Sequence, residues 1–218
     1  MQTVIPFLKK LKKNNNKAWF DENRALYDNA KKEIEEMVSV LIETYGKTDP
    51  TIAHLTVKEC LFRINRDVRF SKDKSPYKTN FGIAITSGGK KSPLAGYYLH
   101  IEPGQSFAGG GLWMPGPPVL SAVRQEIDYN FKEFQGILKS ASFKKQYGEL
   151  YKGEDASLTR VPKGYDADNP AAEFLKLKSF LAMKPLTDEE INSTGLIKTT
   201  CDAFKALKPL VDFMNQTA

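Results

Sequence analysis

Apolar residues in the first 46 positions recur at steps of three and four, the spacing typical of amphipathic helices. This spacing predicts a short helix over residues 3–13, with Thr3 as a candidate N-cap. A second, longer helix is expected to follow Asn16 and to end at Gly46. The apolar faces of the two helices are Phe7, Leu8 and Leu11, and then Phe20, Tyr27, Ala30, Ile34, Met37, Val38, Leu41 and Tyr45. Both helices are therefore expected to pack against a core.

Farther along the chain, β-branched and aromatic residues become frequent, a composition typical of strands. The segment 87–96, SGGKKSPLAG, is rich in turn-forming residues and predicts a hairpin connection between two strands. The glycine- and proline-rich segment 106–120 is expected to end the sheet region. The predicted strands are residues 61–65 (LFRIN), 81–86 (FGIAIT) and 96–102 (GYYLHIE).

The second half of the chain returns to a helical pattern. Pro117 and Pro118 suit the first turn of a helix, where a proline gives up only an amide that has no intrahelical partner. Helix is predicted from there to about residue 147. A turn-rich loop then leads into a short helix. Thr187 with Glu190 predicts a capping box for the C-terminal helical region.

The order of helices, strands and helices predicts the α+β fold class, with an antiparallel β-sheet flanked by N-terminal and C-terminal helices. The chain has no repeat and no long linker, so residues 1–218 are expected to form a single globular domain. Its hydrophobic fraction of 41% and charged fraction of 27% are those of a folded, soluble protein. The first residues lack the pattern of a signal peptide, so a cytoplasmic location and no membrane partner are expected.

The cysteines and histidines are too few and too far apart to suggest a metal centre. Cys60 and Cys201 each lack a nearby second cysteine, which favours two buried thiols over a disulfide framework or a zinc site. The two histidines are His54 and His100. No metal site and no cofactor are therefore expected.

Much of the formal net charge of +6 comes from one stretch of the chain. Between residues 63 and 78 there are six cations and two acids. Converging arginine and lysine side chains can hold a carboxylate or phosphate, and a loop restrained by Pro76 is a suitable platform for them. The candidate ligand-binding residues of this stretch are Arg63, Arg66, Asp67, Arg69, Lys72, Lys74, Tyr77 and Lys78.

The same residues allow a structural interpretation. Asp67 lies between Arg66 and Arg69, so these three side chains can form an ion-pair lattice that fixes the turn. Tyr77 can equally anchor the loop to the core. The sequence leaves both interpretations open.

A second candidate region follows the predicted strands. Gly109, Gly110 and Gly111 allow backbone amides to point into one concavity, next to the N-terminus of a predicted helix, where an anion can bind. Trp113 and Arg124 are candidate ligand-binding residues of the same region. The glycines can instead serve a bulge or a close crossing of a strand and a helix.

His100 and Glu102 are two residues apart in a predicted strand, which places them on the same face. Such a pair can act in acid–base catalysis, with neutral His100 as the base, so both are candidate catalytic residues. Alternatively, both lie on the solvated face of the sheet. No P-loop, nucleophile elbow, dinucleotide-binding or zinc-protease signature accompanies them, so whether the protein is an enzyme stays open.

Three segments together resemble the bacterial family called domain of unknown function 2461. They are RDVRFSKDKSPYKTNFG (66–82), GYYLHIEPGQSFAGGGLWMPGPPVLSAVRQEI (96–127) and PKGYDADNPAAEFLKLKSF (162–180). The resemblance covers nearly the whole chain and implies a single domain, but no established activity. Asn169 departs from the pattern, because the resemblance implies a histidine before Pro170 in many relatives.

We expect the charged stretch and the glycine region to converge on a pocket for an anionic small molecule, phosphorylated or carboxylated. One alternative is a non-specific nucleic-acid-binding module, in which aromatic residues stack on bases while lysines meet phosphates. Another is a structural or interaction protein whose Arg–Asp lattice only holds the fold. The oligomeric state stays open. The aromatic residues of the nucleic-acid hypothesis are Phe70, Tyr77, Tyr97, Tyr98 and Trp113.

Overall fold

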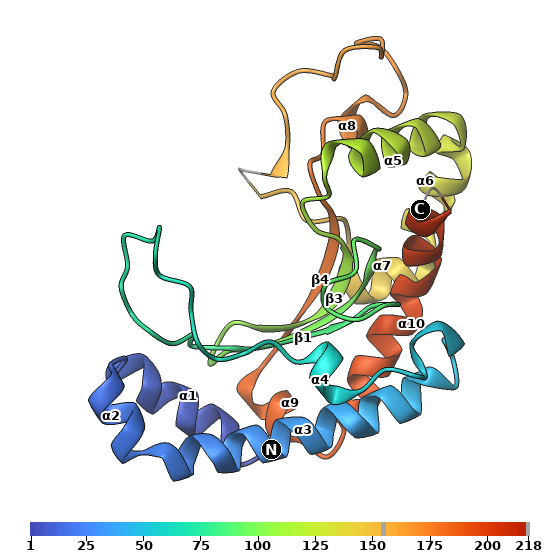
Figure 1. Ribbon diagram of the computed structural model, residues 1–218. Coiled ribbons are helices and arrows are strands. Elements are labelled where there is room, and N and C mark those ends of the chain that lie inside the picture. Colours follow the sequence, from blue (N-terminus) through green and yellow to red (C-terminus); the bar gives the residue numbers. More distant parts are fainter. Residues whose placement is uncertain (154–155, 217–218) are drawn as a thin grey trace. The chain divides into compact units, whose positions relative to one another are not determined.

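The computed structural model describes residues 1–153 and 156–216. In this part of the chain, four strands form an antiparallel sheet, and helices come before the first strand, between the third and fourth strands, and after the fourth (Figure 1). The predicted α+β class is therefore confirmed. No helix among the described residues is long and apolar enough to span a bilayer. The strands follow one another in the sheet in chain order, as β1 (Phe81–Ile85), β2 (Gly96–Ile101), β3 (Ser106–Leu112) and β4 (Phe180–Leu186).

The described residues fall into two compact units. Unit 1 contains residues 1–92, 98–108 and 185–202. Unit 2 contains the described residues of 93–97, 109–184 and 203–218. The expectation that the whole chain forms one globular domain stays a prediction.

Three helices of unit 1 occupy the first 46 residues, α1 (Val4–Lys13), α2 (Lys17–Glu22) and α3 (Arg24–Gly46). Asn16 caps α2, because its side-chain oxygen accepts a hydrogen bond from the Trp19 N–H at 3.0 Å. The prediction of one continuous helix beyond Asn16 is wrong, since Asn23 interrupts it. The Asn23 side chain donates to the Trp19 carbonyl at 2.9 Å and so satisfies the end of α2.

Thr3 occupies the N-cap position of α1 but makes no capping bond through its side chain, so that prediction is wrong. A carboxylate from α3 takes over the role. Glu33 accepts the Thr3 N–H at 3.0 Å and the Gln2 N–H at 3.3 Å. Because negative charge is favourable at a helix N-terminus, this contact both caps α1 and joins it to α3.

Short helical elements complete unit 1. They are a 3₁₀ turn, η1 (Pro50–Ile52), and the helices α4 (Val57–Cys60) and α9 (Asp188–Asn192). The predicted capping box of α9 is confirmed. Glu190 accepts the Thr187 N–H at 2.8 Å, and the Thr187 hydroxyl accepts the Glu190 N–H at 3.2 Å.

Residues 61–65 do not form the predicted strand. They make only two isolated bridges, from Leu61 to Ile83 and from Asn65 to Tyr77. The Phe62 N–H still donates to the Gly82 carbonyl of β1 at 3.0 Å. The prediction is wrong because the chain leaves the edge of β1 after Phe62 and enters a loop, which the second bridge closes.

The strands of unit 1 alternate between a buried and an open face, as a period of two requires. Ile83 on β1 and Leu99 and Ile101 on β2 are buried in the core. Tyr98 and His100 lie between these positions and are only half-buried. The open face of β2 is therefore available for polar chemistry.

The expectation that residues 106–120 end the sheet is wrong for its first seven residues, which form β3. Glycines allow this strand to lie very close to its neighbours in unit 2. A side chain on Gly110 would overlap the Gly96 carbonyl oxygen, and side chains on the glycines before and after it would overlap carbonyl oxygens of β4. β4 itself was not predicted.

Unit 2 is mainly helical. Pro117 begins its first helix, as predicted, and helix continues to Tyr147 with breaks at Asn130 and Ser140. The hydroxyl of Ser140 accepts the Phe143 N–H at 3.3 Å and so caps the last of these helices. The helices are α5 (Pro117–Tyr129), α6 (Phe131–Lys139), α7 (Ala141–Tyr147), α8 (Ala172–Leu175) and most of α10 (Leu196–Asn215).

Candidate functional site

The charged segment 66–76 is a loop that is closed at its base by backbone hydrogen bonds. The Arg66 N–H donates to the Pro76 carbonyl at 2.9 Å, and the Lys78 N–H donates to the Ile64 carbonyl at 2.8 Å. Figure 1 shows the segment as a long teal loop that projects from unit 1. Its shape therefore depends on contacts at the base and on bonds within the loop.

Tyr77 fixes the base of the loop to the N-terminal helices. The Asn15 side chain accepts the Tyr77 N–H at 3.1 Å and donates to the Tyr77 carbonyl at 2.9 Å. The Tyr77 ring is buried and stacks on Phe20, with 4.0 Å between the ring centroids. These contacts support the anchoring role of Tyr77, because its ring faces the core.

Arg66 binds groups of its own loop. Its guanidinium donates to the Asp73 carboxylate at 2.5 Å, to the Ser75 carbonyl at 3.1 Å and to the Ser71 hydroxyl at 3.3 Å. Asp73 also accepts the Ser75 N–H at 2.9 Å and the Ser75 hydroxyl at 2.7 Å. The Ser75 bonds and the bond from Arg66 lower the pKa of Asp73 to about 2. Arg66 is thus paired with an acid inside the loop.

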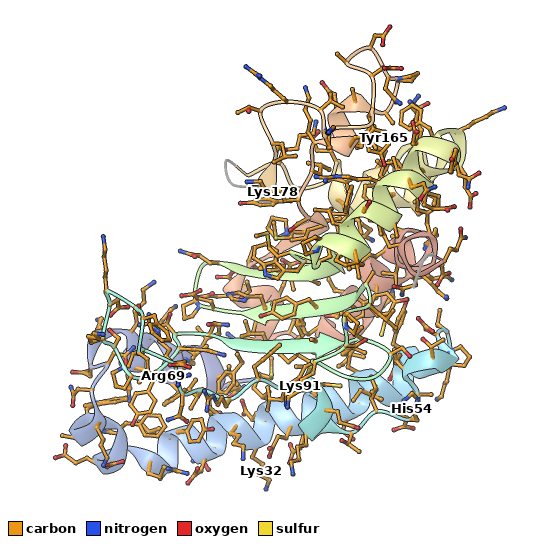
Figure 2. All side chains as sticks on the ribbon, turned by 45° about the horizontal axis from the view of Figure 1, so that its top comes forward. Lys32, His54, Arg69, Lys91, Tyr165 and Lys178 are labelled. Carbon is orange, nitrogen blue, oxygen red and sulfur yellow. The ribbon has the colours of Figure 1, made fainter. Side chains whose placement is uncertain are left out.

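Arg69 is also paired. Its guanidinium makes a two-point contact with Asp67, at 3.0 and 2.7 Å (Arg69 is labelled in Figure 2). Lys74 donates to the Val68 carbonyl at 3.0 Å, and the exposed Lys72 makes no ion pair with a described residue. Arg66 and Arg69 therefore have separate aspartate partners, and the predicted shared lattice through Asp67 does not form.

Four cations of the stretch have no acidic partner among the described residues, and only one of them, Lys78, is not exposed. The four are Arg63, Lys72, Lys74 and Lys78. Lys78 is half-buried and lies over the Phe62 ring, with its Nζ 5.3 Å from the ring centroid. Burial, and after it the charge of nearby Arg63, lowers the pKa of Lys78. We call Phe62, Arg63 and Lys78 the Arg63–Lys78 site.

The candidate catalytic pair lies at the end of β2, with His100 in the strand and Glu102 directly after its last residue. The Nε2 of His100 is 3.2 Å from a Glu102 oxygen, and the two side chains are only 18% and 15% exposed. Glu102 also accepts the Thr79 hydroxyl at 2.8 Å, and the Asn80 amide nitrogen lies 3.4 Å from His100 Nδ1. A neutral imidazole with its proton on Nε2 satisfies both contacts, so the pair is held in one orientation.

Residues 78–80 connect the cations to this pair. Lys78 belongs to the Arg63–Lys78 site, while the next two residues bind Glu102 and His100. We call His100, Glu102, Thr79 and Asn80 the His100–Glu102 network. Thr79 and Asn80 are absent from the sequence-based candidates, although they directly follow Lys78 in the motif PYKTN.

An aromatic group lies on the same face of the sheet. The ring of Phe107, from β3, is nearly parallel to that of His100, with centroids 5.0 Å apart. Tyr98 lies 5.8 Å from Phe107 and 6.1 Å from His100. The Tyr98 hydroxyl lies against Gly82 of β1, so a side chain at position 82 would overlap it. The Phe62 ring would be in contact with the same added side chain. Tyr98 is therefore close both to the His100–Glu102 network and to the part of β1 that Phe62 approaches.

The remaining candidates belong to unit 2. The three glycines serve the close approach of strands, Trp113 is exposed, and Arg124 donates to the Leu177 carbonyl at 2.9 Å. Within the nucleic-acid hypothesis, Tyr97 is buried like Tyr77, whereas Phe70 is 95% exposed.

Neither cysteine is prepared for metal binding or nucleophilic attack. Cys60 and Cys201 are free thiols, and burial raises the pKa of each to about 11. Among the residues that the structure describes, no group of three or more histidine, cysteine, aspartate or glutamate side chains is placed to hold a metal ion.

Comparison with known proteins gives one match. A family model described as conserved hypothetical protein (DUF2461) matches residues 3–213. The match includes all three segments that carry the resemblance noted in the sequence. No curated protein and no solved structure matches the chain.

Proposed function

Because the chain belongs to the DUF2461 family of conserved hypothetical proteins, whose description names no activity, we propose a function from its own residues. The Arg63–Lys78 site binds the oxyanion of a phosphorylated or carboxylated small molecule. The His100–Glu102 network, which adjoins it along the chain, binds neutral polar groups of the same ligand.

One observation carries this proposal: a half-buried lysine next to a second cation, with no acid among the described residues to pair with either. Removing an ammonium group from water is unfavourable unless an opposite charge compensates. Arg66 and Arg69 have such compensation from Asp73 and Asp67, whereas Lys78 does not. A bound oxyanion would supply the missing charge.

The chemistry of the two side chains suits this ligand. The planar guanidinium of Arg63 can donate two parallel hydrogen bonds to a phosphate or carboxylate, and the ammonium of Lys78 can approach as a point charge. Phe62 contributes an apolar wall that strengthens the charge interaction by excluding water.

The test uses inorganic sulfate, which keeps the same charge across the accessible pH range. Its affinity is measured by titration calorimetry at constant ionic strength for the wild type, Lys78→Met and Arg63→Gln. Each substitution removes one charge-assisted contact of about 1.5–3 kcal/mol, so sulfate should bind about ten- to a hundredfold more weakly. The matched control is Lys91→Gln, which removes an exposed lysine from unit 1 (Figure 2) and should leave the affinity unchanged.

Sulfate also stabilises most proteins without binding them, because it is excluded from their surface. The comparison between variants separates binding at the Arg63–Lys78 site from this general effect. Equal sulfate affinity in the wild type and both site variants would overturn the proposal. So would the absence of measurable sulfate binding to the wild type.

A further inference from the structure

Arg124, on α5 of unit 2, is a cation whose hydrogen bonds are incomplete. Its Nη2 donates to the Leu177 carbonyl at 2.9 Å, but its Nε is buried and has no partner among residues 1–153 and 156–216. Asp128 lies one helical turn away and could pair with it, yet this carboxylate accepts the Asn169 amide instead, at 2.6 Å. Arg124 makes no ion pair within the described part of the chain.

An arginine in this state is costly to the folded protein. A buried donor without an acceptor loses its hydration and gains nothing in return, and the penalty is larger for a charged group. Burial lowers the pKa of Arg124, and the nearby Tyr165 phenol only partly opposes this effect. The guanidinium is therefore electrostatically prepared for an anion.

A second, independent feature lies beside the same segment of chain. The Met114 N–H donates to the Ser179 hydroxyl at 2.8 Å, two residues beyond the carbonyl that Arg124 binds. Met114 has φ = 41°, a left-handed conformation that is unfavourable for a side chain other than glycine. The turn presents Trp113, which is 69% exposed, to solvent. Backbone strain that exposes a large aromatic ring is typical of a binding site.

We infer that unit 2 contains a site for an aryl oxyanion, in which Arg124 binds a phosphate or carboxylate and Trp113 packs against the attached aromatic ring. Tyr165 is near enough to Arg124 to affect its pKa. In the sequence, Lys178 lies between Leu177 and Ser179, the two residues that Arg124 and Met114 contact; Figure 2 labels Tyr165 and Lys178. This site uses none of the residues of the Arg63–Lys78 site, and its test is independent of the proposed function.

The experiment uses phenyl phosphate and follows tryptophan fluorescence in the full chain. Trp19→Phe removes the other tryptophan, so Trp113 becomes the sole reporter. We expect a saturable change in Trp113 emission at millimolar phenyl phosphate. Because ring packing adds about 0.5–1.5 kcal/mol, inorganic phosphate should bind roughly two- to tenfold more weakly. Benzoate in a parallel titration distinguishes a carboxylate preference from a phosphate preference.

Arg124→Gln in the same background should weaken phenyl phosphate binding about ten- to a hundredfold. The matched control, Arg160→Gln, removes an exposed arginine of unit 2 and should leave the Trp113 titration unchanged. Circular dichroism and the melting temperature check that each variant is folded.

Trp113→Ala provides a second test that does not depend on Arg124→Gln folding, because Trp113 is exposed. This variant is measured by calorimetry in the Lys78→Met background, which weakens phosphate binding at the Arg63–Lys78 site, and there phenyl phosphate should bind no more tightly than inorganic phosphate. The inference is overturned if the Trp113 emission of Trp19→Phe does not saturate. It is also overturned if folded Arg124→Gln, or Trp113→Ala in the Lys78→Met background, binds phenyl phosphate like its parent protein.

Discussion

Lys78 and Arg66 belong to the same basic segment but differ in how their charge is compensated. Arg66 has an aspartate, a hydroxyl and a carbonyl as partners within its loop. Lys78 has an aromatic ring and a second cation beside it. Local charge density therefore does not show which cations of this segment are compensated, whereas their acid partners do.

The lowered pKa of Lys78 predicts how anion binding depends on pH. Sulfate binds the protonated amine, so its affinity should fall as pH rises through the pKa of Lys78, at a lower pH than for an ordinary lysine. The stability of the fold without sulfate depends on pH in the opposite direction. Because the pKa of Lys78 is lower in the folded than in the unfolded chain, the protonated amine destabilises the fold at neutral pH. This destabilisation disappears as the pH rises through the pKa of Lys78 in the folded protein and then through that in the unfolded chain. Calorimetric titrations from pH 7 to pH 10 measure the first effect.

Lys78→Arg is the control for this prediction, because arginine stays charged throughout that range. The variant should retain sulfate binding with little dependence on pH. A wild-type affinity that falls no more steeply than that of Lys78→Arg would show that Lys78 does not carry the anion.

Some features of the site can be predicted from single residues and others cannot. The alternation of a strand places His100 and Glu102 on one face, and the structure brings them to 3.2 Å. The partner of Arg66 is Asp73 and not the nearer Asp67, because the path of the loop decides which carboxylate comes close. The contact from Thr79 to Glu102 spans 23 residues and depends on the sheet, so local sequence does not specify it.

At the scale of elements, the strongly periodic segments are the predictable ones. The helical positions of α1 and α5 and the hairpin strands β1 and β2 follow from spacing and turn residues. β3 and β4 do not. Glycine is unfavourable in strands and the β4 sequence FLAMKPL contains proline, so neither has the composition of a strand. Both segments are strands because of backbone packing, which composition alone does not reveal.

Gly110→Ala should destabilise the protein by about 3 kcal/mol or more, because two penalties add. The new methyl group would overlap the Gly96 carbonyl oxygen, and residue 110 has φ = 144°, which suits glycine. The free energy of unfolding in urea measures the effect.

Gly136→Ala is the matched control. Gly136 lies within helix α6, and a side chain there would meet no other atom within 4 Å. This variant should be more stable than the wild type by about 0.5–1 kcal/mol, since alanine favours helix. Comparable losses in the two variants would contradict the packing role of Gly110.

For the whole molecule, the order of elements is sufficient to predict the α+β class but not the division into units. The division cuts through β2, β3, β4 and α10, so each of these elements contributes residues to both units. Contacts of this kind depend on the folded path of the chain and leave no break in composition. An element that spans two units also links their stability, because it cannot unfold in one alone without losing contacts.

We therefore predict one cooperative unfolding transition, as expected for a single domain. Trp19 lies in unit 1 and Trp113 in unit 2, so the variants Trp19→Phe and Trp113→Phe each leave a reporter in one unit. In each variant, the unfolding curve in urea is followed both by tryptophan fluorescence and by circular dichroism. The free energy of unfolding from fluorescence should equal that from circular dichroism, which also measures any effect of the substitution on total stability. Two separate midpoints within one variant, by fluorescence and by circular dichroism, would show that the units unfold independently.

The two hydrogen bonds between the Asn15 side chain and the Tyr77 backbone have a consequence for peptides of this chain. A synthetic peptide of residues 61–82 would contain every charged group of the loop but not the amide, 62 residues distant from Tyr77, that holds its base. Such a peptide would sample many shapes, because the ordering comes from outside it. Antibodies raised against it would consequently recognise the denatured chain better than the folded protein.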